Sequence, residues 1–150
     1  MTKVAFYGHG LPGLGKGELP GKLIVVEGTD GVGRSTQVAL LREWLESSGY
    51  AVASSGLKRS NLAGKGIALA QEGHYLGALT SCLLYATDLA DRLEREILPA
   101  LRAGFVVLTD RYIYSLIARA LVRGGDREWV YNVLGFALIP DQVFYLRAGL

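Results

Sequence analysis

The chain of 150 residues is half hydrophobic, so it can bury one sizeable core but is too short for two ordinary domains. Sixteen basic and fourteen acidic residues leave a formal charge of +2 that is spread along the chain, so nucleic acid is not an expected partner. The apolar runs have the length of strands, well below the roughly 18 residues of a membrane-spanning helix, so we expect no membrane association.

Residues 1–21 differ in composition from the rest of the chain. They contain many glycines, the prolines Pro12 and Pro20, and a short apolar piece at 4–7 that is a candidate edge strand. We interpret them as an N-terminal extension of a single domain that covers residues 22–150.

The domain shows a regular alternation of strands and helices. Apolar runs predict strands at 23–26, 50–54, 105–109 and 142–146, and apolar residues at helical spacing predict helices at 38–45, 76–101, 113–122 and 127–136. A glycine-containing loop is expected between the second strand and the long helix. This order predicts an α/β fold with a doubly wound parallel sheet and helices on both faces.

The long helix 76–101 is expected to have one dry and one wet face. The apolar positions are Leu79, Leu83, Leu89, Leu93, Ile97 and Leu101. The wetter face is marked by Asp91, Arg92, Glu94 and Arg95.

A cytoplasmic location is expected from two features of the chain. The N-terminus lacks the apolar core of a secretory signal, and the single cysteine, Cys82, cannot form an internal disulfide. Both features are typical of proteins in a reducing compartment.

The strongest chemical signal lies between the first strand and the first helix of the domain. It is the run Gly28, Thr29, Asp30, Gly31, Val32, Gly33, Arg34, Ser35 and Thr36, which has the spacing of a phosphate-binding loop. Glycines let successive backbone N–H groups point inward, and the following helix presents its positive end to the same anion. The run therefore predicts an ATP phosphate site, and the alternative is an ordinary glycine-rich turn.

Two side chains of this loop carry further chemistry. Ser35 has the position whose hydroxyl binds Mg²⁺, and Arg34 supplies the cation that neutralises charge on the β and γ phosphates. Lysine is usual where Arg34 stands. Because a planar guanidinium is bulkier than an ammonium, phosphate binding should survive the exchange better than transition-state positioning.

A second match to the same spacing, at residues 10–16, lacks the context of a phosphate site. Gly17 replaces the hydroxyl residue, and Pro20 and Gly21 follow where a helix would have to begin. We interpret this segment as a flexible loop.

Asp110, Arg111 and Tyr112 follow the strand 105–109 directly. Ligands of open α/β sheets bind beyond the carboxyl ends of the strands, so Asp110 and Arg111 should face the phosphate loop. A carboxylate can hold Mg²⁺ or its waters, and an arginine can bridge phosphates. The alternative for this group is a salt bridge at the end of a strand.

Over residues 23–146 the chain resembles thymidylate kinases. The matching segments are 26–31 with 35–37, 84–88, 97–104, 110–112 and 140–146. Several such segments in one order are more specific than any single motif. The resemblance implies a P-loop NTPase fold and transfer of the γ-phosphoryl group of ATP, with Mg²⁺, to a nucleoside monophosphate, most closely dTMP.

The resemblance also implies roles for individual residues. Asp30 would lie near the acceptor's sugar and Mg²⁺, Tyr85 would stack on the base, Arg111 would grip the acceptor phosphate, and Ser115 would line the pocket. A loop-capping Asp30 and a core aromatic at Tyr85 are the alternatives. Alignment and charge neutralisation would then drive transfer, without a general base.

The chain departs from the family at several acceptor positions. Leu89 stands where an arginine usually contacts the acceptor, and Arg92, one turn on, is a candidate substitute. Arg119 replaces an aromatic near the sugar. The family's Arg-Glu-Pro loop is replaced by a segment whose Lys58 and Arg59 are interpreted as solvated charges, with contact to a phosphate as the alternative. A kinase for another nucleotide or a deoxynucleoside, or a nucleotide-binding module with little activity, is therefore an alternative.

Two expectations concern the whole protein. The family continues with a lid and a last strand, so we expect this chain to be C-terminally incomplete. The resemblance also suggests a homodimer through the helix 76–101, although a buried core helix would have the same apolar stripe.

Overall fold

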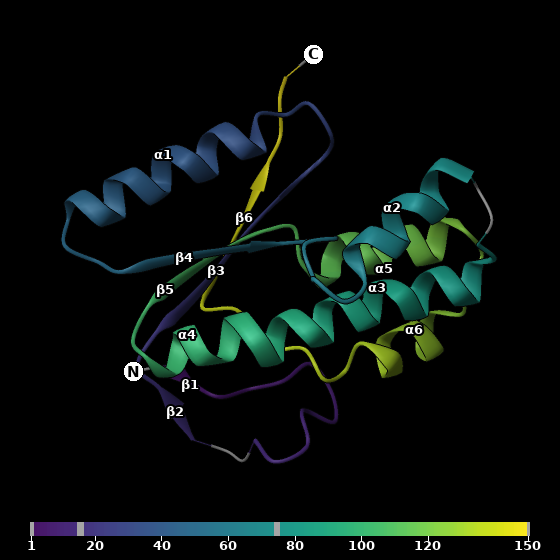
Figure 1. Ribbon diagram of the computed structural model, residues 1–150, viewed down its shortest axis with the longest axis horizontal. Coiled ribbons are helices and arrows are strands. Elements are labelled where there is room, and N and C mark those ends of the chain that lie inside the picture. Colours follow the sequence, from purple (N-terminus) through teal and green to yellow (C-terminus); the bar gives the residue numbers. More distant parts are fainter. Residues whose placement is uncertain (1, 15–16, 74–75, 150) are drawn as a thin grey trace.

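The computed structural model describes residues 2–14, 17–73 and 76–149 (Figure 1). At its centre is a four-stranded parallel sheet in the order β4-β5-β3-β6. These strands are β3 (Lys22–Gly28), β4 (Val52–Gly56), β5 (Val106–Asp110) and β6 (Gln142–Leu146). The carboxyl ends of β3, β4 and β5 meet at one edge of the sheet, where the phosphate loop begins.

Helices cover both faces of this sheet, as predicted (Figure 1). They are α1 (Arg34–Ser47), α2 (Gly64–Gly73), α3 (Ala78–Arg92), α4 (Leu98–Arg102), α5 (Ile113–Val122) and α6 (Arg127–Val133). A π-helical turn, η1 (Leu93–Ile97), joins α3 to α4. Helix α1 lies on one face, and α3, α4 and α5 lie on the other.

Strand β5 shows how both faces are packed. Its Val106 and Leu108 pack with Leu45 of α1, whereas Val107 belongs to the larger cluster that includes Leu93 and Ile97. All six side chains are buried. An uninterrupted apolar strand therefore fills two cores at once, which is why its sequence shows no alternation.

The N-terminal extension packs against the domain. Strand β1 (Thr2–Lys3) pairs with β2 (Glu18–Leu19) in an antiparallel hairpin. The Gly8 N–H donates to the Gly135 carbonyl at 2.9 Å, and a Cβ on Gly8 would lie 2.8 Å from the Gly135 Cα, so glycine is required for this close approach. The predicted edge strand at 4–7 is wrong: Phe6 makes an isolated bridge to Leu138 instead.

Helix α2 was not predicted, because Gly64 and Gly66 favour a loop. Packing explains the first of these glycines: a Cβ on Gly64 would lie 2.4 Å from the carbonyl oxygen of Lys58. The predicted helix 76–101 corresponds to α3, η1 and α4 together.

The predicted dry and wet faces of that long helix are partly wrong. Leu79 and Leu83 are 59% and 44% exposed, whereas Asp91 and Arg92 are buried. The reason is that Arg92 forms an ion pair with Asp88 inside the protein, at 3.0 Å. Periodicity alone cannot reveal that acidic and basic residues one turn apart neutralise each other.

Two further sequence predictions concern the second glycine-rich match and membrane-spanning helices. After the second glycine-rich match the chain enters β2 and not a helix; Gly15 and Lys16 of that match lie outside the described residues. Within the described ranges no helix combines the length and the apolar character needed to cross a bilayer.

Candidate active site

The phosphate loop joins β3 to α1. Gly31 and Gly33 have positive φ angles of 77° and 93°, which glycine adopts without strain. A Cβ on Gly28 would lie 2.8 Å from Val32 Cγ1 and 3.0 Å from the Leu146 carbonyl oxygen. The loop therefore needs its glycines, and it leads into the positive end of a helix, an arrangement that binds anions.

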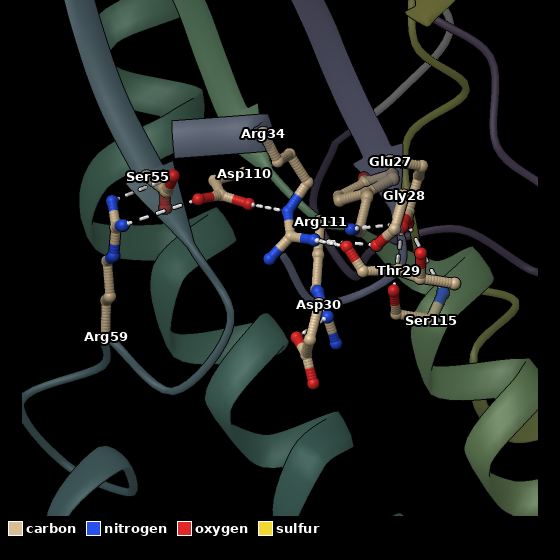
Figure 2. Close-up of polar contacts among 11 residues, drawn as sticks. Glu27, Gly28, Thr29, Asp30, Arg34, Ser55, Arg59, Asp110, Arg111 and Ser115 are labelled. Carbon is tan, nitrogen blue, oxygen red and sulfur yellow. Dashed lines mark hydrogen bonds and ion pairs between the residues drawn. The ribbon is translucent and has the colours of Figure 1, made fainter. Parts of the chain in front are cut away.

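Arg34 begins α1, and its side chain turns toward the loop (Figure 2). Its Nη1 donates to the carbonyl oxygens of Gly28 at 2.7 Å and Thr29 at 3.0 Å. Its Nε donates to the Asp110 carboxylate, which lies 76 residues further along the chain. The structure thus brings together the two groups predicted at the phosphates and the metal.

A second pair of opposite charges lies beside the first. Arg111 donates from Nη2 to Asp30, an exposed carboxylate of the phosphate loop (Figure 2). Arg111 has a φ of 67°, unusual for a residue with a side chain, and its buried Nε has no hydrogen-bond partner among the described residues. An unusual backbone conformation and an unsatisfied buried donor are both typical of functional positions.

Glu27 was not singled out from the sequence, although it organises the start of α5. It is buried, and its carboxylate accepts hydrogen bonds from the Tyr112 N–H at 2.8 Å and the Ser115 N–H at 3.3 Å. The Ser115 hydroxyl also donates to it, at 2.7 Å. The carboxylate thereby satisfies free donors at a helix N-terminus. The sequence signal that could have identified Glu27 is the presence of an acidic residue at the end of an apolar strand.

Ser35 and Asp110 offer hard oxygen ligands. Ser35 is exposed in the first turn of α1, and the Asp110 side chain is 10% exposed at the end of β5. The described part of the chain has no cluster of three or more His, Cys, Asp or Glu residues that could hold a metal ion by itself. A hydroxyl and one carboxylate suit Mg²⁺, which completes its coordination with waters and substrate phosphates.

A cavity of about 580 Å³ lies between α2, α3 and α5. Tyr85 borders it, and the Tyr85 hydroxyl accepts hydrogen bonds from Arg119 at 2.7 Å and from Gln71. The Arg119 guanidinium carbon lies 5.4 Å from the centre of the Tyr85 ring. The remaining lining is largely apolar and includes Ile67, Ala70, Leu76, Leu84, Leu116 and Ala120.

Three predicted positions lie elsewhere than expected. Arg92 is fully buried, where it donates to Asp88 and Ser55, so it does not face an acceptor as predicted. Ser115 is engaged by Glu27 and does not line the cavity. Arg59, interpreted as a solvated charge, points toward Asp110 (Figure 2).

Comparisons with known proteins agree with this geometry. The thymidylate kinase family model matches residues 26–149. The "Probable thymidylate kinase 2" of Saccharolobus solfataricus is 42% identical over 127 residues, 85% of this chain and 59% of the relative. The "Probable thymidylate kinase" of Thermococcus kodakarensis is 42% identical over 132 residues, 82% of this chain and 64% of the relative. This chain thus spans about three fifths of the length of these relatives.

A solved structure, the thymidylate kinase of Ehrlichia chaffeensis, has the same fold. The superposition has a TM-score of 0.76 at 24% identity, and it covers 86% of this chain and 77% of that one. The parallel sheet, the phosphate loop between β3 and α1 and the family match lead to one conclusion. The chain belongs to the thymidylate kinase family and has a P-loop NTPase fold.

Proposed function

We propose that this chain binds ATP with Mg²⁺ and transfers the γ-phosphoryl group to dTMP, giving dTDP. The observation that carries the proposal is the meeting of two arginine–carboxylate pairs, Arg34 with Asp110 and Arg111 with Asp30, at the phosphate loop. Membership of the thymidylate kinase family supports the choice of donor and acceptor.

In this proposal ATP lies along the phosphate loop. The backbone N–H groups between Gly28 and Thr36 bind its phosphates, and Arg34 moves from its carbonyl partners to neutralise charge that grows during transfer. Arg111 holds the acceptor phosphate in line. Because that phosphate oxygen is already a nucleophile, alignment and charge neutralisation are sufficient, and no residue needs to remove a proton.

Ser35 and Asp110 would hold the Mg²⁺ ion that accompanies ATP. When bound, the ion would supply positive charge that offsets the negative charge of the phosphates. The Asp110 carboxylate would help to hold the ion, and an Arg34 side chain released from Asp110 would be free to contact phosphate.

The acceptor base is assigned to the cavity beside Tyr85. Helix α5 supports this assignment, because it begins two residues after Arg111 and reaches Arg119, at the cavity, in fewer than two turns. A phosphate at Arg111 and a base at Tyr85 would therefore be joined along one helix. Leu89 is fully buried, so base recognition would depend on Tyr85, Arg119 and Gln71.

A homodimer and a cytoplasmic location are parts of the same proposal. The exposure of Leu79 and Leu83 on α3 supports a second copy at that helix. Sedimentation of the wild type and of Leu79→Glu tests the dimer: we expect a dimer that dissociates in the variant.

A nucleotide-binding module with little activity is the second candidate. The three contacts of Arg34 with Gly28, Thr29 and Asp110 favour it, since all must be released before the guanidinium reaches a phosphate. The test is to incubate the protein with ATP, Mg²⁺ and a panel of nucleoside monophosphates and nucleosides, following ADP and product. Selective formation of dTDP supports the kinase, whereas ATP binding without transfer supports the module.

A further inference from the structure

Arg147 is a basic residue beside the phosphate loop that has no part in the proposed function so far. It directly follows β6, whose last residues pair with the strand that leads into the loop (Figure 1): Tyr145 lies opposite Glu27, and Leu146 lies opposite Gly28. The approach is close, because a Cβ on Gly28 would lie 3.0 Å from the Leu146 carbonyl oxygen. The register of the sheet therefore fixes the backbone of Arg147 beside the first residues of the loop.

A second cavity, of about 320 Å³, lies between the end of β6 and the loop. It is lined by the loop residues 29–32 and by residues 145–148, and Arg147 is the only basic residue among them. The loop side of the cavity is open: apart from its chain neighbours, a Cβ on Gly31 would meet no heavy atom of the described residues within 4 Å. A group bound along the loop would therefore have the Arg147 guanidinium within reach.

The charge of Arg147 is not neutralised by the protein. Its side chain is exposed and makes no hydrogen bond or ion pair with any other residue in the described ranges. The one acidic residue that lines the cavity, Asp30, is paired with Arg111 instead. Most exposed arginines are simply solvated, but this one shares a cavity with a loop whose backbone is built to bind anions. The arrangement therefore suits an anion held between the loop and Arg147.

We propose that Arg147 binds the α- or β-phosphate of the donor nucleotide from the β6 side of the phosphate loop. This inference rests on the proposed function, since it adds a residue to the same ATP site. The sheet order indicates which phosphates are within reach, because β5 and β6 flank β3 on opposite sides. Transfer requires the γ-phosphoryl group to point toward an acceptor held by Arg111, which follows β5. The phosphates that stay on ADP then lie nearer β6 and Arg147.

A contact with these phosphates predicts a particular kinetic signature. The α- and β-phosphates are present in both ATP and ADP, so the contact exists before, during and after transfer. A group that binds the ground state and the transition state equally lowers KM without raising kcat. Loss of Arg147 should therefore raise the KM for ATP and leave kcat nearly unchanged. Loss of Arg34, which is assigned to charge that grows during transfer, should instead lower kcat.

The first test is calorimetric binding of ATP and of ADP, each with Mg²⁺, to the wild type, Arg147→Ala, Arg147→Lys and Arg102→Ala. Arg102 is an exposed arginine in the last turn of α4, at the opposite end of the sheet, so its variant is the matched control for loss of one positive charge. We expect Arg147→Ala to weaken both nucleotides about 5- to 20-fold, Arg147→Lys to recover part of the loss, and Arg102→Ala to bind like the wild type. Equal affinities of Arg147→Ala and Arg102→Ala would overturn the inference. A loss for ATP but not for ADP would also overturn it, because the contact would then be with the γ-phosphate.

Two further comparisons separate a charge contact with the donor from other roles of Arg147. The loss caused by Arg147→Ala should shrink as ionic strength rises, because salt screens a contact between exposed charges. A loss that is the same at low and high salt would contradict the assignment to phosphate. The affinity for dTMP should be equal in the wild type and Arg147→Ala, because the acceptor is assigned to the β5 side. A variant that loses affinity for dTMP but not for ATP would contradict the assignment to the donor.

Binding and turnover report on different claims. If the wild type binds ATP and ADP but forms no dTDP, and Arg147→Ala binds both more weakly, the inference about Arg147 stands and the proposed kinase activity fails. If the wild type forms dTDP and Arg147→Ala matches Arg102→Ala in nucleotide affinity and in KM, the kinase activity stands and the inference fails. A wild type that binds neither ATP nor ADP would overturn both.

Discussion

Replacement of Glu27 should reveal how strongly α5 and Arg111 depend on one buried carboxylate. Hydrogen bonds to a charged group contribute about 1.5–3 kcal/mol each. Glu27→Ala removes the acceptor of two short bonds, from the Tyr112 N–H and the Ser115 hydroxyl, and of one longer bond from the Ser115 N–H. We therefore expect the free energy of unfolding to fall by about 3–5 kcal/mol.

Glu27→Gln tests the same reasoning with the volume kept. Its carbonyl oxygen can still accept from Tyr112, so the main loss is the negative charge at the start of α5, and we expect about 1–2 kcal/mol. The assay is urea unfolding followed by circular dichroism. Glu46→Ala is the control, because Glu46 lies in an exposed pair with Arg42 and should change stability by less than about 1 kcal/mol. Equal losses for Glu27→Ala and Glu46→Ala would refute this account of Glu27.

Three other substitutions have definite expected outcomes. Gly8→Ala would place a Cβ 2.8 Å from the Gly135 Cα and separate the extension from the domain, so urea unfolding should show a loss of roughly 2–4 kcal/mol; an unchanged midpoint would contradict this packing. Asp91 has a lowered pKa, chiefly because the Ser60 hydroxyl donates to it, so its contribution is present above the unfolded pKa near 3.8 and is lost as pH falls through the lower folded value. Asp91→Asn should therefore flatten the dependence of stability on pH below about pH 4, and an unchanged slope would argue against the shift. Leu89→Arg, which restores the arginine usual in the family, should lower stability by roughly 3–5 kcal/mol because the position is fully buried; a variant as stable as the wild type with tighter dTMP binding would show that this position faces the acceptor.

The parts of the fold that depend on neighbouring residues were predictable. The phosphate loop was identified because its chemistry depends on consecutive residues between a strand and a helix. The meeting of Arg34 with Asp110 followed from a general rule, that parallel strands bring their carboxyl ends to one edge. The catalytic roles of these residues stay predictions until activity is measured.

The parts that depend on long-range pairing were not predictable. Asp88 and Arg92 lie one turn apart in a helix, a spacing that occurs equally on exposed and buried faces, so only the packed structure shows that they are buried. Glu27 and Ser115 are 88 residues apart, and no local pattern connects them. Arg59 lies in a segment that lacks the family's Arg-Glu-Pro motif, and only the structure shows that its side chain points toward Asp110.

The most direct test of the central claim is to follow the labelled γ-phosphoryl group of ATP. The purified protein is incubated with Mg²⁺, labelled ATP and dTMP, with Arg34→Ala as the control, and ATP binding is measured in parallel. We expect labelled dTDP from the wild type and a large loss of product in the control. If no labelled dTDP forms although the protein binds ATP, the kinase assignment is contradicted and a nucleotide-binding module remains.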